Sequence, residues 1–409
     1  MSNTDKQRRY AERRVIFCAT LSMLLFSSAA LSEQWKLTPS ITLEERYDDN
    51  IKLTTDPHES VTGTLLKGKV GFSRLTENSG VTGRIHLDLS DYSGDEVAKD
   101  NNSNLHLSLA SHYGTELVRW GLNGSFKKDT TLRNIEFIDD EPDFDIDDGV
   151  DSGIVNVDIE RNAAVLTPSW EYKLDERTTL NAGYSYLDVS YKDNPSGSGL
   201  FDYDQNSVSA GIFYKLSERD TINARVGFLH FQSPGNFDNK VDSYDFTLGY
   251  KRNFSEILSG SIDFGANYTE QESSVLNTDT GGYILQLKLN RKTEVKRFSV
   301  SLGHDLKPSG SGSVVETSQL KLKMVHNFSR RLSGGIAARY FDRKPLVSTQ
   351  GNTERYFSIE PSIKWKFDRW WTVAGGYRFR SNENANNIDT AESNAVFVSL
   401  RHNKSLIFD

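Results

Sequence analysis

Residues 353–380 read TERYFSIEPSIKWKFDRWWTVAGGYRFR, and the alternation within this stretch predicts the fold. Every second residue from Ile359 to Phe367 is apolar, and the residues between them are charged or serine. The segment from Trp371 to Arg380 alternates in the same way. A period of two is typical of a β-strand with one apolar face, whereas a helix would scatter these residues around its axis. The stretch therefore predicts two strands joined by a short turn.

The same pattern recurs along most of the chain. Residues 80–90, 105–110 and 283–290 also alternate, and the short turns resemble one another at intervals of 36 to 42 residues. A regular spacing of this size indicates one repeated hairpin. Longer polar connectors lie between the turns, at 192–202, 233–239, 270–280, 307–314, 343–352 and 382–392.

Connectors of two alternating lengths predict an all-β fold, a closed antiparallel transmembrane β-barrel with short periplasmic turns and long extracellular loops. Hydrocarbon cannot satisfy backbone N–H and C=O groups, so a sheet in a membrane must close on itself. Eight short turns, with both ends of the barrel on the periplasmic side, predict about 18 strands, the first at residues 37–45; 16 strands is the alternative. A soluble sandwich or propeller gives no reason for the two connector lengths.

Residues 1–32 have the composition of a secretory signal peptide, which leaves residues 33–409 for the barrel. Residues 1–14 carry a net charge of +3, an apolar run extends from Val15 to Leu25, and small residues follow. This order is typical of a signal cleaved near Ser32, or near Ala30. A retained anchor is the alternative. The only cysteine, Cys18, lies within this segment. We expect an exported protein of the cell outer membrane that contains no disulfide.

Two prolines interrupt the predicted strands. Pro168 and Pro361 lie in the middle of alternating segments. Proline lacks the N–H that a sheet ladder needs, so it is confined mainly to strand edges and bulges. We therefore expect a β-bulge at both positions.

The inward face of the predicted barrel carries many basic residues. Lys67, Lys69, Arg84 and Arg119 lie on N-terminal strands, and inward acids (Asp88, Glu171, Asp245, Asp263) are fewer. Charges of one sign along a pore set its ion preference, so this lumen would favour anions. Mutual neutralisation by salt bridges is the alternative. The basic candidates of the C-terminal half are Lys288, Lys321, Lys323, Arg339, Lys364, Lys366, Arg378 and Arg380.

Other candidate chemistry is sparse, and we expect neither an enzyme nor a bound cofactor. His86, His106 and His112 lie on the predicted inward face, but a hydrolase would need one of them beside a serine. The acidic run at 139–149 spaces Asp143, Asp145 and Asp147 like a calcium loop. Its glycine comes one place late and Ile154 stands where the loop needs Glu. A solvated acidic loop is the alternative interpretation.

Residues 38–53 read TPSITLEERYDDNIKL. This segment resembles the opening signature of the β-barrel porin family of outer-membrane proteins that accompany exopolysaccharide biosynthesis and exosortase (PEP-CTERM) systems. The rest of the chain resembles that family in architecture only. Asp49 and Asn50 tolerate turn geometry, so they would cap the first extracellular loop, or contact glycan. The matching residues are Glu45, Tyr47, Asp49, Asn50, Ile51 and Leu53.

The resemblance implies a role in exopolysaccharide export. We expect passive conduction through a polar, partly basic lumen. Expected partners are outer-membrane lipid and lipopolysaccharide, the barrel-assembly machinery, the polysaccharide itself and periplasmic polysaccharide-export components, with no nucleic acid. Two alternatives stay open: a general porin for small anionic solutes, and a structural or adhesive surface barrel with a closed lumen.

Overall fold

The computed structural model describes residues 34–56, 58–94, 103–131, 159–192, 198–234, 238–274, 277–346, 353–384 and 390–408. The predicted signal peptide and the calcium candidates Asp143, Asp145 and Asp147 lie outside these ranges. Among the described residues, no helix has the length and hydropathy needed to cross a membrane.

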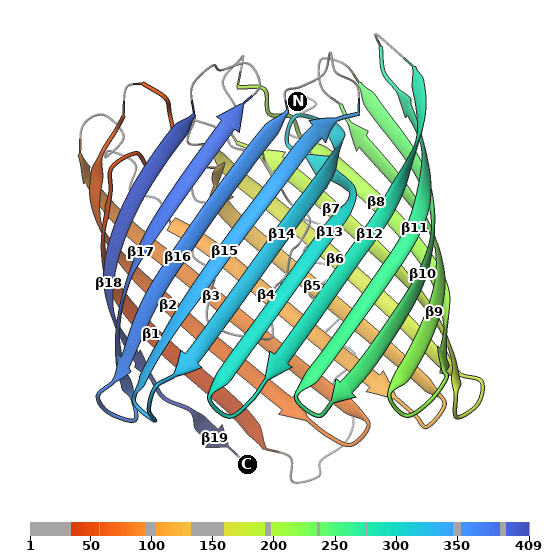
Figure 1. Cartoon of the computed structure of the whole chain (residues 1–409), viewed down its shortest axis with the longest axis horizontal. Coiled ribbons are helices and arrows are strands. Elements are labelled where there is room, and N and C mark those ends of the chain that lie inside the picture. Colours follow the sequence, from red (N-terminus) through yellow and green to blue (C-terminus); the bar gives the residue numbers. More distant parts are fainter. Residues whose placement is uncertain are drawn as a thin grey trace, which may run out of the picture.

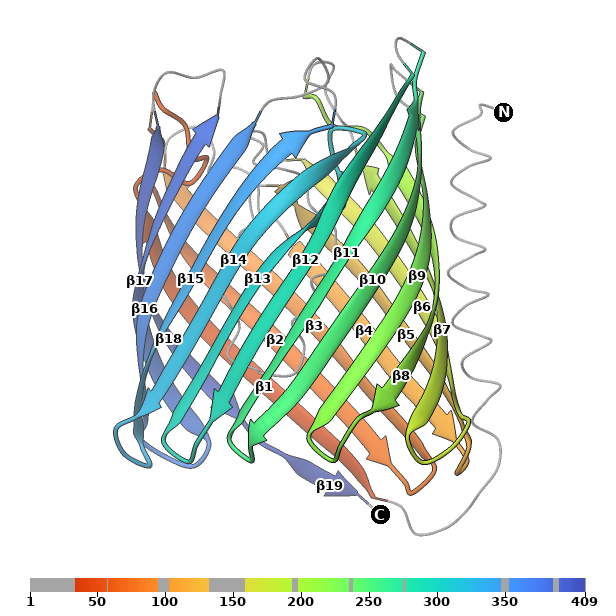
Figure 2. The ribbon, with the colours of Figure 1, turned by 45° about the vertical axis from the view of Figure 1, so that its right-hand side comes forward.

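The chain forms one closed antiparallel barrel, as the alternation predicts (Figures 1 and 2). Each strand pairs with its neighbours in sequence, and β1 pairs with both β2 and β18, which closes the ring. The first nine strands are β1 (Trp35–Asp48), β2 (Val61–Leu75), β3 (Ser79–Gly94), β4 (Ser103–Gly114), β5 (Val118–Thr130), β6 (Glu160–Lys173), β7 (Thr178–Tyr191), β8 (Tyr203–Lys215) and β9 (Asp220–Ser233).

The second half has the same up-and-down order. Its strands are β10 (Asn239–Ser255), β11 (Leu258–Glu272), β12 (Thr278–Lys292), β13 (Lys296–Ser309), β14 (Ser313–Asn327), β15 (Leu332–Pro345), β16 (Glu354–Lys366), β17 (Trp371–Asn384), β18 (Ala391–Asn403) and the short β19 (Leu406–Phe408).

The short β19 is the end of the eighteenth strand. The pairs Ser40–Asn403 and Trp35–Phe408 belong to one uninterrupted register along β1. Pro39 of β1 accepts a hydrogen bond from the backbone N–H of Lys404 at 3.2 Å but has no N–H to donate in return. Because this donor is missing, the ladder breaks for two residues, and the strand resumes as β19. The predicted count of 18 strands is therefore confirmed.

Eight short turns lie at one end of the barrel, as predicted, and a recurrent side-chain bond explains why their sequences resemble one another. In the turn between β6 and β7, Asp175 accepts hydrogen bonds from the backbone N–H groups of Arg177 and Thr178 at 2.7 and 2.8 Å, which lowers the pKa of its carboxyl. Ser217 and Ser329 accept two such bonds at the equivalent positions of two other turns. Aspartate and serine favour turns for this reason.

The predicted bulges at the two prolines are wrong. Near Pro168, the β6–β7 ladder omits two pairings and resumes in the same register, and the β16–β17 ladder does the same near Pro361. The other edge of each proline keeps regular pairing. Dropping two pairings accommodates the missing N–H without adding a residue, so every later side chain keeps its face.

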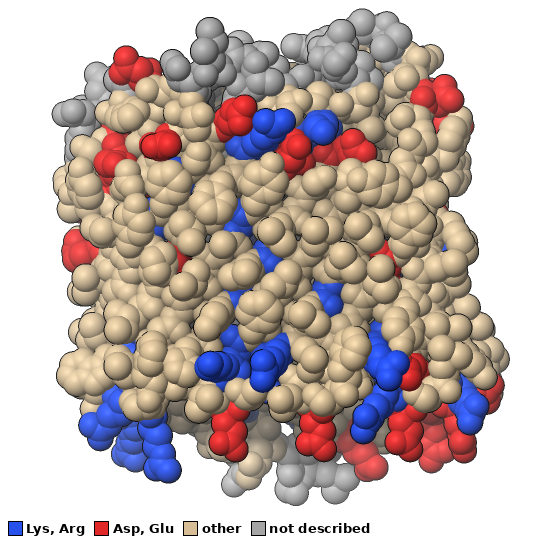
Figure 3. All heavy atoms as spheres, viewed as in Figure 1, with Lys and Arg blue, Asp and Glu red and all other residues tan. Residues whose placement is uncertain are grey.

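The outside of the barrel is apolar. Side chains such as Leu87, Val226, Leu248 and Phe264 point outward and are exposed. In Figure 3 the charged atoms gather mainly along the two margins of the visible wall, and the zone between them is mostly uncharged. An apolar band bounded by polar margins is the surface of a barrel that spans a bilayer. Aromatic pairs near the short turns mark the lower margin: Trp35–Phe72, Trp120–Trp170, Trp170–Tyr172 and Trp365–Phe367.

The end of the β13–β14 hairpin leaves the wall and folds into the mouth of the barrel. β13 pairs with β12 only as far as His304, whereas its pairing with β14 continues to Ser309 and Ser313. We call residues 305–314 the inward hairpin, since from Val315 onward β14 pairs with β15 in the wall. The carbonyl of Gly310 accepts from the backbone N–H of Phe201 at 2.8 Å, and the carbonyl of Gly312 accepts from the side-chain amide of Asn239 at 2.9 Å.

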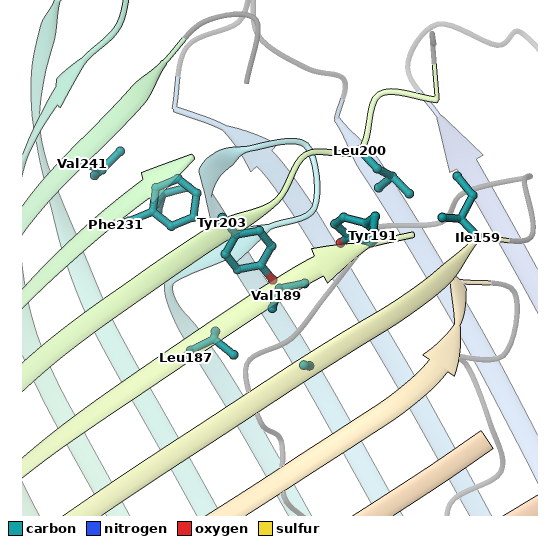
Figure 4. Close-up of a cluster of buried hydrophobic side chains, with 10 residues drawn as sticks. Ile159, Leu187, Val189, Tyr191, Leu200, Tyr203, Phe231 and Val241 are labelled. Atoms are coloured by element: carbon teal, nitrogen blue, oxygen red, sulfur yellow. The ribbon is translucent and has the colours of Figure 1, made fainter. Parts of the chain in front are cut away.

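A buried apolar cluster holds the inward hairpin in place (Figure 4). Val314 of the hairpin is 1% exposed and belongs to one cluster with Tyr203, Phe231 and Val241 of β8, β9 and β10. Apolar side chains on the inward face of the barrel gain free energy by covering one another and excluding water. The cluster thus fills part of the lumen at the loop end.

Candidate functional site

The register of the ladders decides which residues face the lumen, because residues directly opposite on neighbouring strands point to the same side of the sheet. The inward set contains the buried Arg46 and Glu44 of β1, and the outward set contains the exposed Ile41 and Leu43. Following partners from β1 around the ring places all eight basic candidates of the C-terminal half on the inward face, together with Lys67, Lys69, Arg84 and Arg119.

One line of cross-strand partners connects four of these candidates. It contains six basic residues, five serine or threonine residues and no acid. We call it the basic row, and in order its members are Lys215, Thr221, Lys251, Ser261, Lys288, Ser301, Lys321, Arg339, Ser358, Arg380 and Ser393.

The basic row climbs the inner wall from one end of the barrel to the other. Its first member, Lys215, is the last residue of β8 at the short-turn end, and its last member, Ser393, is the third residue of β18 at the loop end. Strands in a barrel tilt, so a line of partners perpendicular to them winds along the barrel axis. The row therefore offers positive charge at successive depths of the pore.

Sequence patterns alone missed two of the six basic members of the row. Lys215 and Lys251 lie near short turns, where the alternation ends and exposed lysines are common. Only the summed register of ten neighbouring strands places them in line with Arg380.

The upper end of the row is closed by an ion pair. Arg380 is 2% exposed, and its Nη2 donates to Asp48 Oδ2 at 2.8 Å and to Ser393 Oγ at 2.8 Å. This guanidinium is held by the wall, so its charge is largely compensated. The wall therefore compensates the charge at the upper end of the row, whereas the lower members Lys251 and Lys288 are exposed.

The remaining basic candidates lie in other lines of partners. Lys323 and Arg378 belong to the line next to the basic row, which also contains the inward acid Glu360. Lys364 and Lys366 lie nearer the short turns on β16.

The wall formed by β1 to β6 contains carboxylate–cation pairs. Lys67 Nζ lies 3.0 Å from Glu44 Oε2, and Arg46 Nη2 lies 2.6 Å from Glu44 Oε1. Arg161, which is 0% exposed, makes a two-pronged bond to Asp129 at 2.9 and 2.7 Å. Mutual neutralisation therefore applies to these pairs on this side of the lumen.

The three predicted inward histidines are placed on β3 and β4. His86 and His106 are cross-strand partners, and His86 Nε2 lies 2.7 Å from Asp88 Oδ1. His112 opposes Gly80 further toward the short turns. Within the described ranges, none of the three has a hydrogen bond to a serine hydroxyl, which a nucleophilic serine would require.

The segment that carries the family resemblance forms a latch at the loop end. Asn50 is fully buried, and its side-chain amide donates to the carbonyls of Thr54 at 2.7 Å and Glu392 at 2.8 Å. Asp49 accepts from the backbone and side-chain amides of Asn394 at 2.7 and 2.9 Å. These bonds join the loop after β1 to β18, so they cap the loop and fasten the seam where the barrel closes.

The latch turns the loop after β1 into the lumen. Leu53, with a φ of 53°, is buried against Phe341, Tyr356 and Ala391 of the inner wall. Ile51 of the same loop packs against a second cluster, formed by Val61 and Leu65 of β2 and Tyr92 of β3. We call residues 49–56 and 58–60 the inward loop. Glu45 and Tyr47 of the signature point outward from β1.

No metal site accompanies these elements: within the described ranges, no three His, Cys, Asp or Glu side chains are grouped so as to hold an ion.

No family model and no curated protein matches the sequence. Similar solved structures include OpdK of Pseudomonas aeruginosa, with 11% identity and a TM-score of 0.44 over 90% of this chain and 99% of that one. The outer membrane channel DcaP of Acinetobacter baumannii gives 13% and 0.45 over 92% and 99%. A BenF-like porin from Pseudomonas fluorescens gives 11% and 0.45 over the same shares. With identity and TM-score this low, the cargo must be argued from this chain's own residues. The closed barrel and its apolar outer band give this chain the architecture of an outer-membrane β-barrel protein.

Proposed function

We propose that the barrel is a passive outer-membrane channel that prefers anionic solutes. The observation that carries this proposal is the basic row, in which six cations and five hydroxyl groups follow one another from the short-turn end toward the loop end without an acid. Each cation of the row would offer an anion a charge-assisted hydrogen bond. The next member of the row is its partner on the neighbouring strand, so the anion could pass from one to the other. Several weak sites in succession allow both entry and release. A barrel of 18 strands is wide enough to hold an aqueous path.

Liposome swelling tests the proposal. Proteoliposomes are diluted into isosmotic solutions of gluconate, glucose or a quaternary ammonium ion of similar size. We expect the anion to enter faster than the neutral sugar, and the sugar faster than the cation. In the triple variant Lys288→Gln, Lys321→Gln, Arg339→Gln, the advantage of the anion should fall at least about tenfold, as expected when charge-assisted bonds in a pore are removed.

The matched control removes three charges from the short turns. Arg177, Arg219 and Arg331 lie in turns outside the ladders, and their triple change to Gln alters the net charge equally. This control should keep the wild-type order of rates. Equal loss in both triple variants would show that net charge, and not the row, sets the preference, and the proposal would fail.

A polysaccharide cargo is the finer form of the proposal. The resemblance of residues 45–53 to exopolysaccharide-associated barrels supports it, and a row that contains both cations and hydroxyls suits a sliding acidic glycan. Its partners would be the glycan and periplasmic polysaccharide-export components. An added anionic polysaccharide should then block the ionic current reversibly. Current that the polysaccharide leaves unchanged favours a small-solute porin, and a barrel without current favours a structural or adhesive role.

A further inference from the structure

A second basic site contains no member of the basic row and lies toward the short-turn ends of the strands around the seam. A cavity of about 270 Å³ opens on the inner wall where β18, β1, β2 and β3 lie side by side. Its lining includes Lys36, Lys69, Arg84 and Arg401, and none of its lining residues is acidic. We propose that this cavity is a binding site for a multivalent oxyanion, a small solute that carries two or more negative charges as phosphate or carboxylate.

The register explains why four cations meet here. Lys69 and Arg84 lie on the inward face of the neighbouring strands β2 and β3. Lys69 opposes His86 and Arg84 opposes Gly71, so the two pairs are consecutive on the inward face. Lys36 lies four residues before Ser40, the partner of Lys69, and Arg401 lies two residues before Asn403, the partner of Ser40. Inward residues two apart share one face, so the four side chains line one patch of wall.

A glycine provides the room. Gly71 lies on the inward face at the centre of this patch, and a methyl group added there would meet its nearest neighbours, atoms of Thr38, only at 3.9 Å. The space above Gly71 is thus open. A larger residue would extend into the cavity without first displacing the backbone.

Size and charge together define the ligand. The cavity has room for about nine water molecules at roughly 30 Å³ each, which suits a small organic anion better than a chloride ion. Two guanidinium groups offer paired donors that match the oxygens of phosphate and carboxylate. Four cations in one lining favour an anion with more than one charge, because the Coulomb attraction grows with each added negative charge.

The test measures binding rather than conduction. The detergent-solubilised barrel is titrated calorimetrically with inorganic phosphate at pH 8 and, separately, with acetate. We expect saturable phosphate binding and acetate binding at least about tenfold weaker. The variant Lys69→Gln, Arg84→Gln should weaken phosphate binding about tenfold or more. The variant Gly71→Leu should do the same while every charge is kept.

Matched controls separate a site from a general positive potential. Lys292→Gln, Arg297→Gln likewise removes one lysine and one arginine from neighbouring strands, here β12 and β13. Gly183→Leu enlarges an inward glycine of β7, where an added methyl group would lie 3.5 Å from its nearest neighbour, Ser209 Oγ. Both should bind phosphate within about twofold of wild type. Heat-modifiable migration in gels confirms that each variant is folded.

Absence of saturable phosphate binding to the wild-type barrel would overturn the proposal. Equal losses in the cavity pair and the control pair would overturn it as well, and so would full binding by Gly71→Leu. The inference rests on the anion channel proposed above only for how the solute reaches the site. A barrel that binds phosphate and conducts nothing would refute the channel and leave this site standing.

Discussion

At the scale of single residues, the structure shows how a short motif, residues 45–53, fastens the first loop to the last long strand. The resemblance of residues 45–53 did not show which of them matter, because the partners of Asn50 and Asp49 are on β18, more than 300 positions away. Sequence alone suggested a capped turn for these residues, and the structure confirms it. The inward direction of the loop depends on distant aromatic residues, Phe341 and Tyr356, which no local pattern connects to Leu53.

Asn50→Ala should release the inward loop. The substitution leaves the carbonyl of Glu392 and the backbone N–H of Thr54 without the partners that Asn50 provides, in part-buried bonds. Each lost bond destabilises by about 1–3 kcal/mol. A reporter cysteine at Thr55→Cys is expected to react faster with a maleimide in the variant than in the parent carrying only the reporter.

Asn78→Ala, in a turn at the opposite end, serves as the control and should leave the labelling rate unchanged. Equal labelling of the reporter with and without the Asn50→Ala substitution would contradict the latch.

The buried pair Asp129–Arg161 gives a second residue-scale prediction. Asp129→Ala leaves the 0% exposed guanidinium without its two-pronged partner, and such losses destabilise by about 3–5 kcal/mol. The double variant Asp129→Ala, Arg161→Met should recover most of that loss, because the orphaned charge is gone. Urea unfolding in lipid vesicles measures both, and a double variant less stable than Asp129→Ala would refute the interpretation.

At the scale of elements, strands and short turns could be predicted and inward-folding elements could not. Alternation is a local signal, and each strand of 12 to 17 residues carries several periods of it. Residues 307–314 are mostly Gly, Ser, Pro and Lys, like the other long connectors, so the sequence predicts an ordinary polar loop there. The inward position of this segment depends on the packing of Val314 against Tyr203, Phe231 and Val241, and these contacts exist only once the barrel has closed.

Val314→Asn should loosen the inward hairpin. An amide buried among apolar side chains without a partner costs about 1–3 kcal/mol in proteins. The hairpin should then leave the mouth part of the time, and single-channel conductance should rise or fluctuate between two levels. Val295→Asn, an exposed position in a short turn, is the control and should conduct as wild type. Unchanged, steady conductance in the Val314→Asn variant would show that the hairpin does not narrow the path.

The prolines provide the second prediction at this scale. Because the ladder beside Pro361 keeps its register, Pro361→Val should restore backbone pairing toward β17 without moving any side chain. A net backbone hydrogen bond contributes about 0.5–1.5 kcal/mol, so the variant should be more stable by up to that amount in urea unfolding. A clear destabilisation would instead indicate that the proline ring fills a specific place on the outer face.

At the scale of the whole molecule, the basic row is a property of the closed barrel. The alternation predicted which residues face inward, and hence that the lumen is rich in cations. It did not predict that Lys215 and Arg380 share one line, because that line sums the register of ten strands. Nor did it separate the acid-free row from the paired wall at Glu44 and Asp129.

The zero-current potential of the wild-type barrel in a planar bilayer, under a tenfold KCl gradient, tests the central claim most directly. If cations on the inner wall set the preference, chloride crosses more readily than potassium and the dilute side becomes negative. A dilute side that becomes positive, or a folded barrel that carries no current, would contradict the account.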